Sequence, residues 1–167
     1  ICCSIAFLAA ARMAAAGEGH VVEPFAVKAA KEKMPAKDFR LKDIAGNEVT
    51  LESFKGKVVL LHFWASWCEP CKIEFPALKR LSESFRDKGL VVVGISEDSR
   101  ERTIPFVKEL GVTFPILFDQ YGGVMRDYRV LVIPVSVIIN SDGSVEGALV
   151  GPREYDSREA IEYFEKI

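Results

Sequence analysis

The hydrophobic residues of this chain form two continuous runs and one run with helical spacing. Residues 58–63 and 90–95 are almost entirely apolar and do not alternate with polar residues. Strands that are covered on both faces have this pattern, because neither face meets water. After residue 68, Leu78, Leu81 and Phe85 recur at intervals of three and four, which predicts a helix from about 69 to 87. Buried strands followed by amphipathic helices indicate an α/β fold.

Shorter patterns predict the remaining elements. Residues 38–43 and 48–51 flank Ala45-Gly46-Asn47 and read as a hairpin ahead of the main sheet. A helix is expected from near Pro105 to Gly111, a strand at 116–118, and a short helix within 119–128. A second hairpin is expected from 135–139 and 144–150, because Asn140-Ser141-Asp142-Gly143 between them is a turn sequence. A capping box at 156–159 opens a closing helix.

Composition narrows the classes of function. With 167 residues and a formal net charge of -2, the chain has the size of one domain and no basic surface for nucleic acid. His20 and His62 are its only histidines, so a histidine-rich metal site is not expected. Cys68 and Cys71 are not expected to form half of a zinc site either, because a second pair of ligands is missing. No cofactor is predicted.

The first residues predict an exported protein. Residues 1–11 are mostly apolar, and Ala14-Ala15-Ala16 offers a cleavage site of small residues. We therefore interpret 1–17 as the end of a signal peptide or as a membrane anchor whose start is missing, although a buried N-terminal helix is the alternative. Residues 18–37 are charged, contain Pro24 and Pro35, and are expected to be a linker with at most a short helix. Removal of the leader would also remove Cys2 and Cys3.

The chemistry is expected at Cys68 and Cys71, which lie where the first buried strand meets the long helix. A sulfur at a helix N-terminus faces unpaired N–H groups, and this lowers a thiol pKa from about 8.5 toward about 7 or less. Cys68 is then the nucleophile of disulfide exchange, and Cys71 is the resolving thiol one turn further on. A purely structural disulfide is the alternative, but such bonds usually close longer loops. Pro70 suits the first turn of the helix.

Two further residues are candidates for the same site. Extending the apolar stripe of the helix backward by three or four residues reaches Glu74 and then Cys71, so Glu74 is expected on the buried side near the cysteines. Burial would raise its pKa and let it pass protons to and from Cys71, whereas a surface glutamate is the alternative. Pro134, which precedes the strand at 135–139, leaves Ile133 free to pair with a substrate backbone. His62 is interpreted as structural.

Several of these motifs together resemble the thioredoxin superfamily. They are Trp64-Ala65-Ser66-Trp67, Cys68-Glu69-Pro70-Cys71, Lys72-Ile73-Glu74-Phe75-Pro76 and Ile133-Pro134. The segment from Cys68 to Pro76 is similar to the ResA/TlpA branch of membrane-associated thiol-disulfide oxidoreductases. The resemblance implies a thioredoxin-like redox domain over residues 38–167. It would have a central mixed β-sheet flanked by helices, an N-terminal β-hairpin and an inserted helix-strand segment.

The resemblance also implies a function and partners. Pro134 should be a cis-proline across from the two cysteines, and Glu74 matches the glutamate of the branch. The implied activity is extracytoplasmic reduction of oxidised protein thiols such as those of apocytochrome c, with electrons from a membrane thiol-disulfide transporter. The substrate surface is expected to include Trp64, Trp67, Glu69, Pro70, Ile133 and the loop at Glu97-Asp98. The acid at Glu69 opposes a thiolate and favours a reducing pair.

Two other functions are weighed against this one. A peroxiredoxin shares the hairpin and the sheet, but its peroxidatic cysteine needs a proline seven residues earlier and a threonine or serine three residues earlier. Those positions hold Leu61 and Ala65. A binding domain without catalysis would not require Cys68, Cys71, Glu74 and Pro134 together. Thiol-disulfide exchange is therefore the leading interpretation.

Overall fold

The computed structural model describes residues 22–167. The expected signal peptide or anchor at 1–17, Cys2, Cys3 and the first part of the expected linker, 18–21, lie outside the described residues. Within residues 22–167, none of the helices combines the length and the apolar character needed to cross a bilayer.

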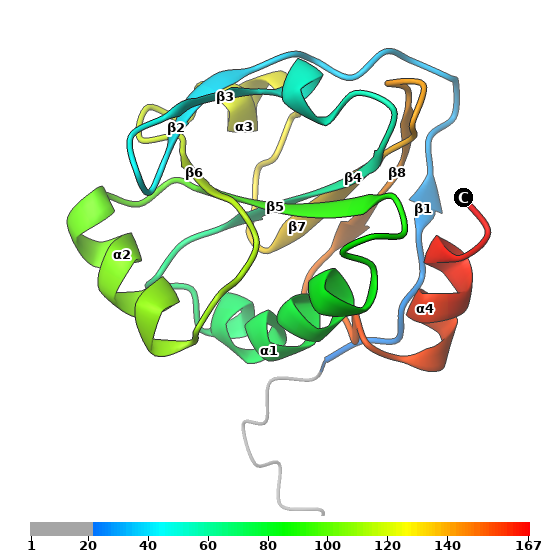
Figure 1. The fold of residues 1–167 in the computed structure, drawn as a ribbon. Coiled ribbons are helices and arrows are strands. Elements are labelled where there is room, and N and C mark those ends of the chain that lie inside the picture. Colours follow the sequence, from blue (N-terminus) through cyan, green and yellow to red (C-terminus); the bar gives the residue numbers. More distant parts are fainter. Residues whose placement is uncertain (1–21) are drawn as a thin grey trace, which may run out of the picture.

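One mixed sheet forms the centre of the described chain (Figure 1). Its eight strands have the order β1-β8-β7-β4-β5-β6-β2-β3. The strands are β1 (Lys28–Ala29), β2 (Arg40–Asp43), β3 (Glu48–Thr50), β4 (Val58–Trp64), β5 (Leu90–Ser96), β6 (Ile116–Phe118), β7 (Val135–Ile139) and β8 (Val145–Val150). The helices are η1 (Leu51–Phe54, a 3-10 helix), α1 (Glu69–Ser84), α2 (Arg100–Glu109), α3 (Gly123–Asp127) and α4 (Arg158–Phe164). The predicted mixed sheet flanked by helices is confirmed.

Strand direction follows the connections. β4 and β5 are parallel and are joined through α1, and β5 and β6 are parallel and are joined through α2. β7 runs antiparallel to both β4 and β8, so the second predicted hairpin is present. The N-terminal hairpin β2-β3 adds to the sheet through β2, which pairs with β6. The α2-β6 unit is the inserted helix-strand segment.

β4 is covered on both faces, as its sequence pattern predicts. Val58, Leu60 and Trp64 lie in one hydrophobic cluster, together with residues of α1, α2 and α4. Val59, Leu61 and Phe63 lie in the other, together with residues of α3 and of the N-terminal hairpin. Because successive side chains of a strand point to opposite faces, His62 points to the side that α1 covers. This places a titratable ring beneath the helix that carries the cysteines.

Three predicted helices have different bounds in the structure. α2 begins at Arg100 rather than near Pro105, which lies in its second turn. A proline is common at a helix start, but the missing N–H of Pro105 removes only the bond to Glu101 and the helix continues through it. α1 ends at Ser84, before Phe85. The helix expected within 119–128 is limited to Gly123–Asp127.

The described part of the expected linker lies against the domain. Residues 22–37 contain no helix, and β1 pairs with the outer strand β8. Phe25 packs against the rings of Tyr155, Tyr163 and Phe164, with centroid distances of 5.5–6.1 Å. The chain before the first hairpin therefore contributes to the core on the side of α4.

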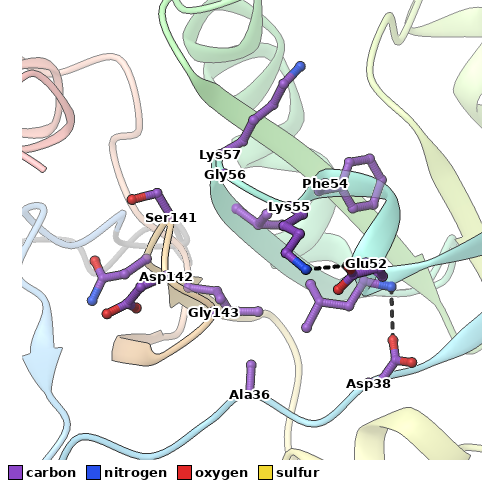
Figure 2. A pocket seen from close by; sticks show the side chains of 14 residues that line it. Ala36, Asp38, Glu52, Phe54, Lys55, Gly56, Lys57, Ser141, Asp142 and Gly143 are labelled. Atoms are coloured by element: carbon purple, nitrogen blue, oxygen red, sulfur yellow. Dashed lines mark hydrogen bonds and ion pairs between the residues drawn. The ribbon is translucent and has the colours of Figure 1, made fainter.

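A surface pocket lies at the end of the sheet where β4 begins (Figure 2). It is formed by the segment from Leu51 to Lys57 and by the turn Asn140–Gly143, and Lys55 within it pairs with Glu52 at 2.7 Å. β4 carries the chain from this pocket toward Cys68, which follows the other end of the strand. The pocket is therefore remote from the cysteines.

Candidate active site

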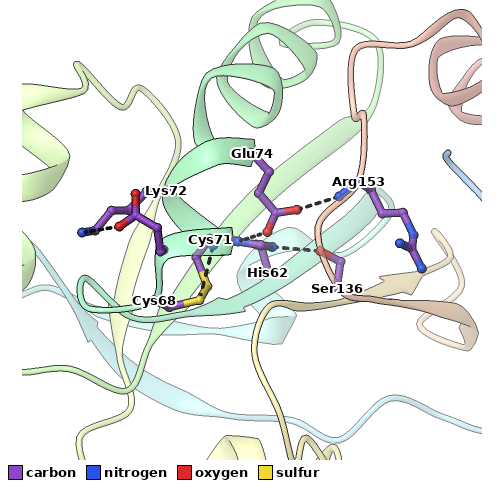
Figure 3. Close-up of a disulfide and its surroundings, with 8 residues drawn as sticks. His62, Cys68, Cys71, Lys72, Glu74, Ser136 and Arg153 are labelled. Atoms are coloured by element: carbon purple, nitrogen blue, oxygen red, sulfur yellow. Dashed lines mark hydrogen bonds and ion pairs between the residues drawn. A yellow bond between two sulfur atoms is a disulfide. The ribbon is translucent and has the colours of Figure 1, made fainter. Parts of the chain in front are cut away.

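Cys68 and Cys71 form a disulfide at the start of α1 (Figure 3). Cys68 is the N-cap residue of this helix, and its sulfur accepts a hydrogen bond from the N–H of Cys71 at 3.3 Å. The unpaired N–H groups of the first turn favour negative charge on this sulfur once the pair is reduced. Cys68 is 4% exposed and Cys71 is fully buried, so Cys68 is the cysteine that a substrate can reach.

The two residues between the cysteines differ in exposure. Pro70 lies in the first turn of α1, where its missing N–H leaves no helical bond unmade. Glu69 is exposed and pairs with Lys72 at 3.0 Å. Because both partners are solvated, the lysine weakens the effect of Glu69 on a thiolate but does not cancel it.

Pro134 lies at the same end of the sheet. The Ile133-Pro134 peptide bond is cis, as the resemblance implies. Val135, which follows, pairs with Phe63 near the end of β4, and this register brings residues 133–134 beside the strand end that leads to Cys68. Within residues 22–167, neither the N–H nor the C=O of Ile133 takes part in a backbone hydrogen bond. Ile133 is thus free to pair with an extended substrate.

Trp64 does not belong to the substrate surface, which corrects the prediction. Its side chain is fully buried and packs against Phe75 and Phe106, with ring centroids 4.4 and 5.2 Å away. Gly94 on β5 leaves room for it, because a Cβ at Gly94 would lie 3.1 Å from the indole nitrogen. The alternation of side chains along a strand explains the burial: Trp64 is the last residue of β4, which is covered on both faces, and it points toward α1.

Exposed apolar side chains surround the site on its outer side. Trp67 is 59% exposed, and Leu131 and Val132, which precede Ile133, are 92% and 58% exposed. Sequence reasoning missed Leu131 and Val132, because apolar residues that lead into a buried strand give no sign of being exposed. Exposed apolar side chains of this kind are typical of surfaces that contact other molecules. We call Trp67, Leu131, Val132 and Ile133 the apolar rim.

The loop at Glu97-Asp98 is tied to the segment before Cys68. The hydroxyl of Ser66 donates to a carboxylate oxygen of Asp98, and the N–H of Glu97 donates to the C=O of Trp64 at 3.2 Å. Burial, together with the charges of Asp98 and Asp119, raises the pKa of Glu97. The structure thus places this loop beside the segment that leads to Cys68, and its contact with a substrate stays a prediction.

Glu74 lies on the buried side of α1, as the helical stripe predicts. It is 1% exposed, and its Oε2 accepts a hydrogen bond from the N–H of Arg153 at 3.0 Å. Burial raises the pKa of Glu74 to about 8, although the Arg153 N–H and guanidinium act in the opposite direction. One turn separates Glu74 from Cys71, and Figure 3 shows the carboxyl beside the disulfide.

His62 is a site residue that sequence reasoning missed. Its Nε2 lies 3.3 Å from Oε1 of Glu74, and its Nδ1 lies 3.0 Å from the hydroxyl of Ser136. The hydroxyl of Ser136 in turn lies 2.6 Å from that of Tyr155. Burial lowers the pKa of His62 to about 3, so the ring is neutral. The available signal was a single titratable residue inside an apolar strand. We call Glu74, His62, Ser136 and Tyr155 the polar chamber.

Arg153 closes the polar chamber, and no sequence signal pointed to it. Its guanidinium contacts the carboxylate of Glu23 and the carbonyl oxygens of Val150 and Pro152. Only its backbone N–H reaches Glu74, and Figure 3 shows the side chain turned away from that carboxyl. Within the described residues, no group of three or more histidine, cysteine or acidic side chains could hold a metal ion.

Comparison with known proteins agrees with this geometry. The sequence profile of the AhpC/TSA family matches residues 33–148. Thiol-disulfide oxidoreductase ResA of Bacillus thuringiensis subsp. konkukian is 33% identical over 133 residues, which cover 79% of this chain and 76% of that protein.

Solved structures lead to the same group. A protein of Chlorobium tepidum assigned as thiol:disulfide interchange protein DsbE is 33% identical with a TM-score of 0.73, covering 83% of this chain and 96% of that one. StoA from Bacillus subtilis is 29% identical with a TM-score of 0.65, covering 77% and 96%. The pair Cys68-Cys71 at a helix N-terminus can exchange two electrons with another dithiol without a further group. The chain therefore belongs to the AhpC/TSA family and is a thiol-disulfide oxidoreductase of the ResA, StoA and DsbE type, with a thioredoxin-like fold.

Proposed function

We propose that this oxidoreductase reduces disulfides of exported proteins, with apocytochrome c as the leading substrate. The observation that carries the proposal is the buried carboxyl of Glu74 beside Cys71 at the N-terminus of α1. Because burial raises its pKa to about 8, Glu74 can take a proton from the resolving thiol in its ionised form and return one in its neutral form. The expected apolar leader, the linker and the ResA relatives support an extracytoplasmic location and a membrane thiol-disulfide transporter as electron donor.

The reaction starts with the reduced pair. The thiolate of Cys68 attacks one sulfur of the substrate disulfide, so that a mixed disulfide forms and the other substrate sulfur leaves as a thiolate that takes up a proton. Cys71 then transfers its proton to the carboxylate of Glu74 and attacks the sulfur of Cys68. The Cys68–Cys71 bond forms, the bond between Cys68 and the substrate breaks, and the second substrate sulfur leaves as a thiolate that takes up a proton from water. Two electrons have moved from the enzyme to the substrate.

Glu74 suits this second step because of its pKa. A general base works best when its pKa lies near the pH of operation, and burial brings Glu74 to about 8. A solvated glutamate would be too weak a base to deprotonate a thiol. After the step, Glu74 holds the proton and can return it when the disulfide is reduced again by the electron donor.

The apolar rim is proposed to hold the substrate. Ile133 offers an N–H and a C=O to an extended chain, and Pro134 offers no N–H that would compete. Trp67, Leu131 and Val132 give apolar contact on either side of Cys68. Glu69 and Pro70 complete the edge of this surface. A rim of this kind selects flexible chains with apolar side chains near their cysteines rather than a particular folded partner.

The reduction potential tests the direction of electron flow. The protein is equilibrated in thiol buffers of known potential. Oxidation of Cys68-Cys71 is followed by tryptophan fluorescence, since Trp64 and Trp67 lie just before Cys68 in the sequence. A potential near or below about -220 mV agrees with a reductant. A potential near about -120 mV is that of an enzyme that installs disulfides, and it would eliminate the proposed role in cytochrome c maturation.

Peroxide reduction is the second candidate, because the matched family profile is that of AhpC/TSA. In the structure, Leu61 and Ala65 occupy the positions where a peroxidatic cysteine needs a proline and a hydroxyl, and both are fully buried and apolar. Neither can hydrogen-bond to a peroxide or to a thiolate. Incubation of the reduced protein with micromolar peroxide should therefore consume it slowly, and rapid stoichiometric consumption would favour the peroxidase instead.

A further inference from the structure

The residues of the polar chamber come from separate segments of the chain. His62 on β4 is the direct cross-strand partner of Ser136 on β7, so their side chains lie on the same face of the sheet. Tyr155 comes from the segment after β8, and Glu74 is on α1, the helix that covers this face of the sheet. All four side chains are at most 1% exposed, and Figure 3 shows His62 between Glu74 and Ser136.

The hydroxyl protons determine in which direction the hydrogen bonds run. Within residues 22–167, the hydroxyl of Tyr155 has one hydrogen-bond partner, the oxygen of Ser136 at 2.6 Å. A buried phenol donates its proton wherever an acceptor is available, so Tyr155 donates to Ser136. The proton of Ser136 then needs a different acceptor, and the hydroxyl has one other partner, Nδ1 of His62 at 3.0 Å.

The hydrogen bond donated by Ser136 determines the tautomer of His62. The imidazole is neutral and carries one proton, and Nδ1 must accept from Ser136. When Glu74 is ionised, the ring proton is therefore on Nε2, where it faces Oε1 of Glu74 at 3.3 Å. Neither of these two atoms has another hydrogen-bond partner in the described part of the chain. The contact is long and not yet aligned as a hydrogen bond in this oxidised form, as is common before the reacting state is reached.

We infer that Tyr155, Ser136 and His62 form a chain of hydrogen bonds that all point toward Glu74, and that His62 is the positioning residue of this carboxyl. The inference rests on the proposed role of Glu74 in proton transfer. When Glu74 ionises, the Nε2 proton binds its Oε1, while Oε2 keeps the N–H of Arg153. Hydrogen bonds to an ionised acceptor are shorter and stronger, so the contact is tightest while Glu74 is a carboxylate and loosens once Glu74 has taken the proton of Cys71.

Other charged groups around Glu74 do not replace this donor. The guanidinium of Arg153 is held by Glu23 and by two carbonyl oxygens, away from the carboxyl. Lys72, on the same helix as Glu74, pairs with Glu69 at the surface. The remaining titratable neighbours are the cysteines themselves and Tyr155, which burial keeps protonated by raising its pKa. His62 is thus the side chain that can stabilise the ionised form of Glu74 directly.

Two substitutions separate the two nitrogens of His62. His62→Asn places a polar atom at the δ position, so it keeps the contact with Ser136 and loses the contact with Glu74. His62→Gln places an amide N–H at the ε position, so it keeps the contact with Glu74. The midpoint of Glu74 is followed by carbon NMR of carboxyl-labelled glutamate in wild type and both variants. We expect it to rise by about one to two pH units in His62→Asn, since a hydrogen bond to a charged group has that effect, and to return toward wild type in His62→Gln.

Nitrogen NMR of the wild-type protein tests the tautomer without any substitution. The expected result is a protonated Nε2 and an unprotonated Nδ1 at a pH above about 8, where Glu74 is ionised. A proton on Nδ1, or an unchanged Glu74 midpoint in a folded His62→Asn variant, would overturn the inference. Because the tautomer is measured on the wild type, a variant that fails to fold does not leave the question open.

The proposed function has its own separate outcome. If Glu74→Gln exchanges disulfides as fast as wild type, then Glu74 is not the proton carrier and the proposed function loses its basis. The tautomer and the titration would still report on the hydrogen-bond chain in that case. If Glu74→Gln is slow but His62→Asn leaves both the midpoint and the pH profile unchanged, the inference about His62 fails alone.

Discussion

The two sulfur atoms of the disulfide have opposite surroundings. Cys68 meets the apolar rim, where Trp67, Leu131 and Val132 stand in water. Cys71 has no exposed surface and lies beside the polar chamber, where Glu74 and His62 are buried. Each region reverses the usual arrangement of apolar residues inside and polar residues outside. Departures of this kind cost stability, and both lie at the end of the sheet where β4 leads to the cysteines.

The difference follows from what each sulfur must do. In the proposed function the rim binds and releases many chains, and its side chains are apolar and exposed. The chamber moves one proton at a time in that proposal, and its burial raises the pKa of Glu74 and lowers that of His62. Substitutions that affect only one sulfur or only one region can therefore be told apart by what they change in the reaction.

The largest expected effect comes from exchanging the two cysteines separately. Cys68→Ser should abolish disulfide reduction, because the accessible nucleophile is lost. Cys71→Ser should still attack and should accumulate the mixed disulfide with substrate, since nothing resolves it. Mass spectrometry of the protein after incubation with a disulfide-bonded peptide distinguishes the two. A mixed disulfide on Cys71 in the Cys68→Ser variant would reverse the assigned roles.

The next effect is expected at Glu74. Glu74→Gln keeps the size of the side chain but cannot accept a proton, so resolution of the mixed disulfide should slow by about a hundredfold near pH 7. The wild-type rate should rise with an inflection near pH 8, where Glu74 ionises, and this inflection should be missing in the variant. Glu69→Gln, at an exposed position of the same helix, is the matched control and should keep the inflection.

The same substitution should change stability in a pH-dependent way. The pKa of Glu74 rises from 4.5 to about 8 on folding, so the folded state holds the proton more tightly than the unfolded chain. The resulting stabilisation is fully present below about pH 4.5 and is lost as the pH rises to about 8. Relative to wild type, Glu74→Gln should therefore gain a few kcal/mol of unfolding free energy between these pH values. Urea unfolding of the oxidised proteins at pH 4.5 and pH 8 measures the gain, and an equal difference at both would contradict it.

The smallest effect is expected at the rim. Leu131→Ser and Trp67→Ala each remove one apolar contact from an open surface, so KM for an unfolded disulfide substrate should rise by about three- to tenfold. Because the chamber is untouched, the pH profile and the reaction with a small disulfide should stay as in wild type. Tyr121→Ser removes another exposed apolar side chain and serves as control. Equal loss with the small disulfide would mean that the rim residues act on the sulfurs rather than on the substrate.

Local patterns in the sequence determined the frame of the site. Continuous apolar runs predicted β4 and β5 as strands buried on both faces, and helical spacing predicted α1 and the buried side of Glu74. The position of Cys68 and Cys71 at the junction of β4 and α1 followed from the same two patterns. These features depend on residues within about ten positions of one another, and the periods of strand and helix are local properties.

Only the tertiary structure decided which residues complete the site. His62, Ser136 and Tyr155 come from three distant segments, and they meet because β4 pairs with β7 in one particular register. A shift of one residue would turn Ser136 to the other face. Trp64 is buried because Gly94 on the neighbouring strand leaves space for it. Leu131 and Val132 are exposed because the chain joins the sheet only where β7 begins, at Val135. Register and close packing join residues far apart in the chain, so no local pattern reveals them.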